Sequence, residues 1–142
     1  NWNLPPQKPT GSRTETIHYT DGIVGRKRTV SIYLPDGYQP DRNPSYPTLY
    51  LFDAPIYLNR VEVPNILDNL IEERKIEPII AVLFGTYRST RDVILPLNFK
   101  FKEEFISRFL PLIRSRFNTS TRPEENIIGR SRGTVHNNLT IC

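Results

Sequence analysis

The sequence predicts an α/β fold in which a mostly parallel sheet of about five strands, preceded by an antiparallel hairpin, carries helices on both faces. Two short runs, 48–52 (TLYLF) and 79–84 (IIAVLF), are apolar almost throughout, which is typical of strands buried on both faces. Amphipathic helical segments follow each of these runs. Strands that alternate with helices favour a parallel sheet with helices packed on its faces.

Composition and charge restrict the class of protein. The 142 residues, 37% hydrophobic and 24% charged, fit one globular domain with a single core. The net charge of +4 comes from dispersed residues and favours anionic ligands weakly, without the basic stripe of a nucleic-acid-binding surface. No stretch is apolar for long enough to span a membrane. Two histidines and one cysteine form no metal-ligand pattern, so we expect no metal and no cofactor.

The N-terminal third of the chain predicts an arm and a hairpin. Residues 1–12 contain three prolines and little pattern, as in an extended arm or a linker. Polar and apolar residues alternate over 13–20 and again over 28–34, and Asp21-Gly22 supplies a turn between them. We therefore expect an antiparallel hairpin at the outer side of the sheet.

Two helices are predicted from residues spaced three and four apart. The first begins near Pro64, and its apolar face consists of Val63, Ile66, Leu67, Leu70 and Ile71. The second covers 102–117, and its apolar side consists of Phe101, Phe105, Phe109, Ile113 and Phe117. Pro111 lies inside this second helix and predicts a kink there.

The motif with the clearest chemistry is Gly129-Arg130-Ser131-Arg132-Gly133, which follows a strand-like run over 125–128. A G-x-S-x-G pattern after a strand is typical of a nucleophile elbow, where a sharp turn exposes the serine hydroxyl. Glycines allow the close approach of the two flanks of the turn. This five-residue pattern is loose and also arises by chance. The strand that precedes it here favours a nucleophile elbow.

The proton-handling partners of such a serine are missing from the available residues. In this motif the acid and then the histidine follow the serine in the chain, and only residues 134–142 follow Gly133. His136 is too close to Ser131 to act as its base, and we expect it to be a tail residue. His18 belongs to the outer hairpin and is expected on the surface. A serine without a base is a poor nucleophile, so weak or absent activity is predicted.

From about Pro5 to Gly133 the chain resembles the esterase family of α/β hydrolases, in particular the enterochelin (siderophore) esterase branch. The resemblance covers most of this chain and the first half of the family's domain, so that 13–133 corresponds to the N-terminal part and 134–142 to an atypical tail. The matching segments are RTVSIYLPDGY (28–38), YPTLYLFDA (46–54), VPNILDNLIEERKIEPIIAVLF (63–84), RDVILPLN (91–98), FISRFLPLIRSRF (105–117) and IIGRSRG (127–133).

The resemblance implies a catalytic centre built around Ser131 as the nucleophile. It also implies an oxyanion hole formed by the backbone N–H groups of Arg132 and Ala54. The family usually reads Asp-Gly-Glu where this chain reads Asp53-Ala54-Pro55. Ala54 keeps its N–H but lacks the conformational freedom of glycine, and Pro55 has no N–H to donate.

The resemblance further implies a substrate-binding segment after the strand at 79–84. A family pattern bordering the substrate cleft maps, with Ile94 in place of a glutamate, onto Arg91, Leu95, Pro96 and Asn98. We therefore expect Arg91 and Asn98 to contact the substrate. Arg130 beside the serine either attracts an anionic ester or remains solvated.

The implied function is a serine ester hydrolase of siderophore-esterase type that acts in iron acquisition. The expected partner is a small-molecule ester, with a ferric catecholate siderophore as the candidate, and the expected location is the bacterial cytoplasm or periplasm. The alternative is a non-catalytic remnant or binding module that keeps half of the hydrolase fold. The strand at 126–128 is expected to be an apolar edge covered by a second copy, by the tail 134–142, or by aggregation.

Overall fold

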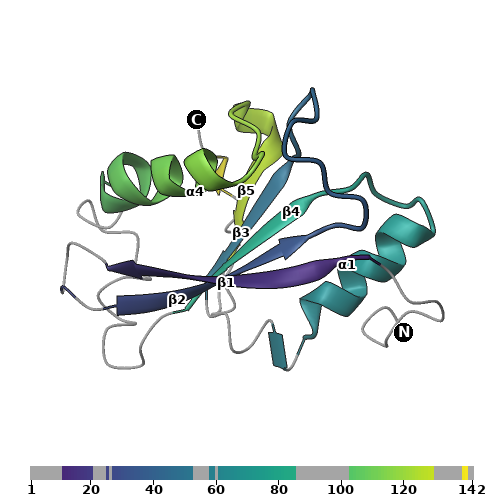
Figure 1. The fold of residues 1–142 in the computed structure, drawn as a ribbon, viewed down its shortest axis with the longest axis horizontal. Coiled ribbons are helices and arrows are strands. Elements are labelled where there is room, and N and C mark those ends of the chain that lie inside the picture. The colour runs from purple at the N-terminus through teal and green to yellow at the C-terminus, as the bar shows by residue number, and fades with distance from the viewer. Residues whose placement is uncertain are drawn as a thin grey trace.

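The computed structural model describes residues 11–20, 25, 27–52, 58–59, 61–85, 103–129 and 139–140. They form a six-stranded sheet in the order β1-β2-β4-β3-β5-β6 (Figure 1). The five predicted strands are present, and a short sixth strand is added. Their bounds are β1 Arg13–Thr20, β2 Lys27–Leu34, β3 Thr48–Phe52, β4 Ile80–Phe84, β5 Asn126–Gly129 and β6 Leu139–Thr140.

The strand pairing confirms the predicted α/β arrangement. Strands β1 and β2 form the expected antiparallel hairpin, and β2 pairs antiparallel with β4. The three central strands β4, β3 and β5 run parallel to one another. Parallel neighbours require crossover connections, and helices lie in both of these connections. Strand β3 is therefore the centre of the parallel part of the sheet.

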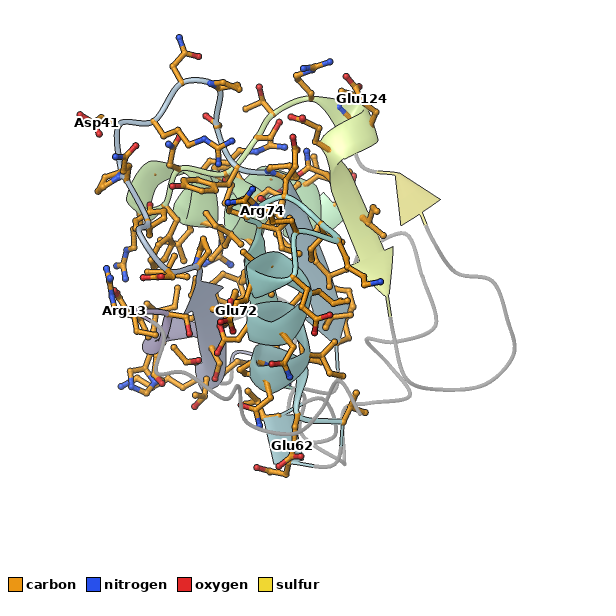
Figure 2. The ribbon with its side chains drawn as sticks, turned by 90° about the vertical axis from the view of Figure 1, so that its right-hand side faces the viewer. Arg13, Asp41, Glu62, Glu72, Arg74 and Glu124 are labelled. Atoms are coloured by element: carbon orange, nitrogen blue, oxygen red, sulfur yellow. The ribbon has the colours of Figure 1, made fainter. Side chains whose placement is uncertain are left out.

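Helix α1 (Val63–Glu72) covers one face of the sheet and matches the first predicted helix. Pro64 lies in its first turn, where the missing N–H of proline costs no helical hydrogen bond. Val63 and Leu67 are buried against Leu51 and Leu83 of the sheet, on the predicted apolar side. Figure 2 shows the helix lengthwise, with Glu62 labelled at one end and Arg74 just beyond the other.

The second predicted helix contains a π-helical segment, η3 (Phe105–Phe109), followed by α4 (Leu110–Arg116). The sequence predicted a kink at Pro111, and the structure places a wider, π-helical turn directly before it. In a regular α-helix the ring of Pro111 would clash with the carbonyl of Ser107, and Pro111 has no N–H to donate to it. A π-turn accommodates this local defect within a continuous helical segment.

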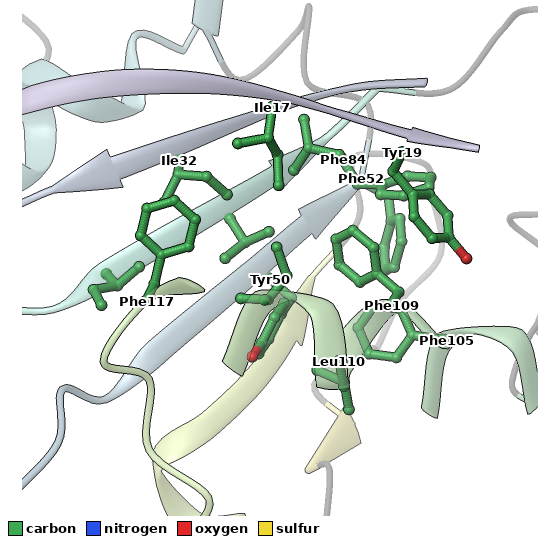
Figure 3. Packing of buried hydrophobic residues seen from close by; sticks show 14 of the residues in the cluster. Ile17, Tyr19, Ile32, Tyr50, Phe52, Phe84, Phe105, Phe109, Leu110 and Phe117 are labelled. Carbon is green, nitrogen blue, oxygen red and sulfur yellow. The ribbon is translucent and has the colours of Figure 1, made fainter. Parts of the chain in front are cut away.

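The two faces of the sheet carry separate apolar clusters, which confirms helices on both sides. Along β4 the side chains alternate, so that Val82 and Phe84 join the cluster beneath η3 and α4. Ala81 and Leu83 join the cluster beneath α1. Figure 3 shows the first cluster, in which half of the buried residues are aromatic. The sheet is therefore the middle layer of three.

The outer edge of β5 is covered by β6, which comes from the chain's own tail. Ile127 and Ile128 pair antiparallel with Thr140 and Leu139. Of the three outcomes predicted for the strand at 126–128, the structure shows coverage by the tail. Ile127 nevertheless remains 44% exposed on the α1 face. Within the residues that the structure describes, no helix has the length and apolar character needed to cross a bilayer.

Two buried tyrosines connect the sheet to its covering layers. The hydroxyl of Tyr33 on β2 donates a hydrogen bond of 2.6 Å to Asp68 on α1. Burial raises the pKa of Tyr33 well above its ordinary value, and the hydrogen bond to Asp68 raises it further. Burial also raises the pKa of Tyr50 on β3 to about 12. Both hydroxyls therefore stay protonated at neutral pH.

These pKa shifts predict a loss of stability in alkali. Because the folded pKa lies above the unfolded value of 10.0, the stabilisation is complete below pH 10.0 and is lost as the pH rises through the folded pKa. We expect the free energy of unfolding to fall by about 1.4 kcal/mol per pH unit for each tyrosine between pH 10.0 and the folded pKa of that tyrosine. Urea titrations that measure the free energy of unfolding from about pH 8 to about pH 11 test this prediction. An equally steep fall in the Tyr33→Phe/Tyr50→Phe variant would contradict the assignment.

Candidate active site at the carboxyl ends of the parallel strands

Strands β3 and β5 end side by side at one edge of the sheet. They pair in parallel with Leu51 opposite Gly129, so that the chain leaves both strands at the same edge. In open α/β sheets this carboxyl edge is where ligands bind. Ala54 lies two residues beyond the end of β3, and Ser131 lies two residues beyond the end of β5. The fold therefore brings together the two strand ends that lead to the predicted nucleophile and oxyanion hole.

The end of β4 adds a third segment to this edge. Phe52 of β3 pairs with Phe84 of β4, so that the segment carrying Arg91 and Asn98 leaves the sheet next to the end of β3. The strand order β4-β3-β5 thus places the starts of all three predicted site segments in a row. The six predicted site residues themselves lie outside the described residues, and their roles remain predictions: Ala54, Arg91, Asn98, Arg130, Ser131 and Arg132.

Gly85 fixes the point at which the chain leaves β4. Its N–H donates a hydrogen bond of 3.1 Å to the carbonyl oxygen of Thr29 on β2. A Cβ atom at this position would lie 2.8 Å from the same oxygen, which is closer than side-chain carbons approach backbone oxygens. Only glycine permits this close approach of β4 to β2. The start of the predicted substrate-binding segment is therefore held against the sheet.

Aromatic rings support the ends of β3 and β4 from the side of the second helical segment. The ring of Phe84 lies 4.9 Å from that of Phe109 and 5.6 Å from that of Phe52, centroid to centroid. Phe105 contacts Phe52 at 5.7 Å, and Tyr19 contacts Phe109 at 5.2 Å (Figure 3). Edge-to-face and tilted contacts at these distances are favourable. The apolar base of the candidate site is thus rigidly packed.

Arg28 is a buried cation at the same end of the sheet, and the sequence analysis did not identify it. Its side chain lies on the same face of β2 as Val30, is only 1% exposed, and places its guanidinium 5.8 Å from the centroid of the Phe84 ring. This cation–π contact adds positive potential close to the end of β4. The signal was present in the sequence, because the alternation that buries Val30 and Ile32 also directs Arg28 inward.

The structure places His18 on the outer strand β1, away from the end of β5. It is exposed on β1, and strands β2, β4 and β3 lie between it and β5. This confirms the prediction that His18 belongs to the surface. His136 lies outside the described residues. Across the part of the chain that the structure describes, no three His, Cys, Asp or Glu side chains gather as metal ligands would.

Comparison with known proteins agrees with this arrangement. The model of the family described as "Putative esterase" matches residues 21–136, which include all six predicted site residues. Endo-1,4-beta-xylanase Y of Acetivibrio thermocellus is 32% identical over 127 residues, which make up 82% of this chain and 11% of that protein. The match to the xylanase therefore concerns a small part of a much longer protein.

Solved structures show the same fold. The ferric enterobactin esterase of Salmonella typhimurium superposes with a TM-score of 0.76 at 20% identity, over 91% of this chain and 32% of that one. The feruloyl esterase module of Clostridium thermocellum, solved as a mutant in complex with sinapinate, gives a TM-score of 0.67 at 26% identity over 91% and 47%. The chain thus spans less than half of the length of these relatives. The family match, the strand order and the superpositions show that the chain belongs to the esterase family of α/β hydrolases.

Proposed function

We propose that this chain supplies the nucleophile half of a serine carboxylic-ester hydrolase of siderophore-esterase type, with Ser131 as the nucleophile. The observation that carries the proposal is the parallel pairing of β3 with β5, which brings the ends leading to Ala54 and Ser131 to one edge. The family match over residues 21–136 supports it as well.

The reaction would be ordinary acyl transfer. The Ser131 oxygen attacks the ester carbonyl carbon while a base takes the hydroxyl proton, and the backbone N–H groups of Ala54 and Arg132 stabilise the oxyanion. Collapse of the tetrahedral intermediate breaks the ester C–O bond, and the alcohol leaves with that proton. Water then attacks the acyl-enzyme and releases the acid.

The base has to come from outside the described residues. The sole histidine in the part of the chain that the structure describes is His18, which lies at the far side of the sheet. We propose that full activity requires an imidazole contributed by further polypeptide, in the same chain or in a partner. In well-studied serine hydrolases, removal of the base and the acid lowers kcat by about 10⁶-fold. We therefore expect very weak activity when that imidazole is absent.

Two substrate classes are supported. Superposition on enterobactin esterases favours a catecholate siderophore ester, for which Arg91, Asn98 and Arg130 would contact the anionic groups. A hydroxycinnamate-type ester is the second candidate, because this chain is 26% identical to the feruloyl esterase module and 19–21% identical to enterobactin esterases of known structure. Substrates of both classes are esters that contain an aromatic acid.

Ester turnover tests this proposal. We expect slow hydrolysis of an activated aryl ester by the 142-residue chain, with the rate falling to the uncatalysed background in Ser131→Ala. The exposed Ser115→Ala on α4 is the matched control and should keep the wild-type rate. A feruloyl ester and a catecholate ester, compared at equal concentration, separate the substrate classes. Equal rates for the wild type and Ser131→Ala would favour the alternative, a non-catalytic binding module.

A homo-oligomer through the edge strand 126–128 is a separate proposal. Strand β6 pairs with only two residues of β5, and Ile127 remains partly exposed beside it. A second copy could therefore add its own strand by displacing β6. Light scattering should then give a dimer mass that returns to the monomer mass in Ile127→Lys. A monomer mass for the wild-type chain would contradict this proposal.

A further inference from the structure

The α1 face of the sheet carries apolar side chains that α1 covers only in part. Ile127 on β5 is 44% exposed, and Leu49, its partner across the strand pair on β3, is half-buried. Leu49 packs against the cluster beneath α1, so it lies on that face of the sheet. Residues directly opposite each other in paired strands share a face, which places Ile127 on the same side. Apolar surface therefore extends from beneath α1 across β3 to β5.

One flank of α1 continues this apolar surface. Ile66 and Leu70 lie four residues apart on the predicted apolar side of the helix, and both are half-buried. Neither belongs to the cluster beneath α1, to which the helix contributes Val63 and Leu67 as buried residues. The helix thus has more apolar surface than it buries against the sheet.

A hydrogen bond to β2 shows which way this flank faces. The Tyr33 hydroxyl on β2 donates to Asp68 at 2.6 Å, so the Asp68 side of α1 faces β2. Ile66 and Leu70 are each two residues from Asp68, which in an α-helix is about 200° around the axis. They therefore point away from β2 and toward β5, since the strand order is β2-β4-β3-β5. In Figure 2, β5 and Arg13 of β1 lie on opposite sides of α1. We call the four side chains the α1–β5 strip: Leu49, Ile66, Leu70 and Ile127.

Charge is distributed unequally along the strip. Glu62 precedes Ile66 by four residues, which places it at the start of α1 on the same flank. It is partly exposed and forms no ion pair with a described residue. At the other end Glu73 follows Leu70 by three residues, and Arg74 beside it makes the charge there mixed. An element that covers the strip therefore meets an unpaired carboxylate at one end.

The strip suits a helix from a distant part of a polypeptide. A strand pairs with a sheet edge, whereas the strip lies on a sheet face, where side chains of a helix can pack between α1 and β5. The connection from β4 to β5 carries η3 and α4 over the opposite face. A right-handed connection from β5 to a strand beyond it passes over that opposite face as well. The helix directly after β5 would therefore not reach the strip.

We propose that the α1–β5 strip is the docking surface for an amphipathic helix of the further polypeptide from which the imidazole is expected. Known esterase structures that superpose on 91% of this chain are matched over only 32% and 47% of their own length, which leaves chain enough for such a helix. Ile66 and Leu70 contact its apolar side from α1, and Leu49 and Ile127 contact it from the sheet. A lysine or arginine of the helix lies opposite Glu62. The inference rests on the proposed function for the source of the helix, whereas the surface itself does not involve Ser131.

Binding of synthetic peptides to the 142-residue chain tests the surface. The probe is a labelled peptide of about 18 residues, with leucines three and four apart and lysines on both flanks of that apolar side. A second peptide has the same composition in an order that forms no apolar side. Fluorescence anisotropy should show saturable binding of the first peptide, about tenfold or more tighter than that of the second.

Variants of the chain locate the bound peptide. Leu70→Glu and Ile127→Glu should each weaken binding by about tenfold or more, because each puts a charge into an apolar contact. Ile106→Glu is the matched control, since Ile106 is also 44% exposed but lies on the helical segment of the opposite face, and it should bind as the wild type does. Glu62→Gln should weaken binding by about threefold at low salt only. If Leu70→Glu does not fold, the exposed Ile127→Glu carries the test.

Equal affinity for the two peptides would overturn the proposal, as would unchanged affinity in Ile127→Glu. A dimer mass in light scattering that Leu70→Glu returns to the monomer would identify a second copy as the occupant and overturn it too. Fluorophosphonate labelling of the same samples separates this inference from the proposed function. Peptide binding without labelling of Ser131 supports the surface and counts against the nucleophile, whereas labelling without peptide binding does the reverse.

Discussion

Replacement of Asn118 by alanine is expected to lower the free energy of unfolding by about 3 to 5 kcal/mol. The Asn118 side chain holds the loop between β2 and β3 by three hydrogen bonds. Its amide nitrogen donates to the carbonyls of Gln39 at 3.1 Å and Arg42 at 2.8 Å, and its oxygen accepts from Ser45 at 2.7 Å. Alanine removes all three bonds and leaves the partly buried Arg42 carbonyl and Ser45 hydroxyl unpaired, which costs more than the bonds themselves, whereas water can replace the bond to the exposed Gln39.

Urea unfolding of Asn118→Ala and Ser45→Ala measures this effect. Ser45→Ala removes only the bond to the Asn118 oxygen, so we expect a loss of about 1 kcal/mol. The backbone bonds of Asn118, from its N–H to the Tyr38 hydroxyl and from Tyr46 to its carbonyl, remain in both variants. A loss below that of Ser45→Ala would show that this side chain does not organise the loop.

Phe109→Ala is expected to be equally damaging, at about 3 to 5 kcal/mol. Phe109 is 1% exposed, and its ring contacts Phe84 at 4.9 Å, Tyr19 at 5.2 Å and Phe105 at 5.3 Å. Truncation removes apolar burial, leaves a cavity in a packed interior and abolishes three aromatic contacts. The same rings support the ends of β3 and β4, so the candidate site should be loosened as well.

The matched control for Phe109→Ala is Ile106→Ala in the same helical segment. Ile106 is 44% exposed, and we expect its truncation to change the free energy of unfolding by less than about 1 kcal/mol. Chemical denaturation of both variants gives the comparison. Similar losses for Phe109→Ala and Ile106→Ala would mean that the aromatic cluster is not the principal core of this face.

The elements that the sequence predicted correctly are those set by local pattern. The apolar runs at 48–52 and 79–84 became β3 and β4, and the spacing after Val63 became α1. These signals come from residues close in the chain and from burial on one or both faces. The π-turn before Pro111 was missed, because a proline in a helix is accommodated by either a kink or a wider turn.

Features that depend on distant residues could not be predicted. Asn118 organises a loop far earlier in the chain, by hydrogen bonds whose separations are 73 to 80 residues. The tail strand β6 was one of three coverings considered for β5, and the sequence did not choose among them.

For the candidate site, the sequence predicted the residue types and the structure supplies the order of the strands. The G-x-S-x-G motif indicated that a strand leads to Ser131, and β5 is that strand. The position of β5 next to β3 is a property of the whole sheet, which the motif alone does not contain. The structure thus explains how residues 77 positions apart, Ala54 and Ser131, come to follow neighbouring strand ends.

The central claim is that β5 presents Ser131 as a nucleophile beside the end of β3. Incubation with a fluorophosphonate, followed by proteolysis and mass spectrometry of the peptides, tests this claim most directly. We predict one adduct per chain, located on Ser131, absent in Ser131→Ala and retained in Ser115→Ala. Adducts spread over other serines, or no adduct on Ser131 at any time of incubation, would contradict the account.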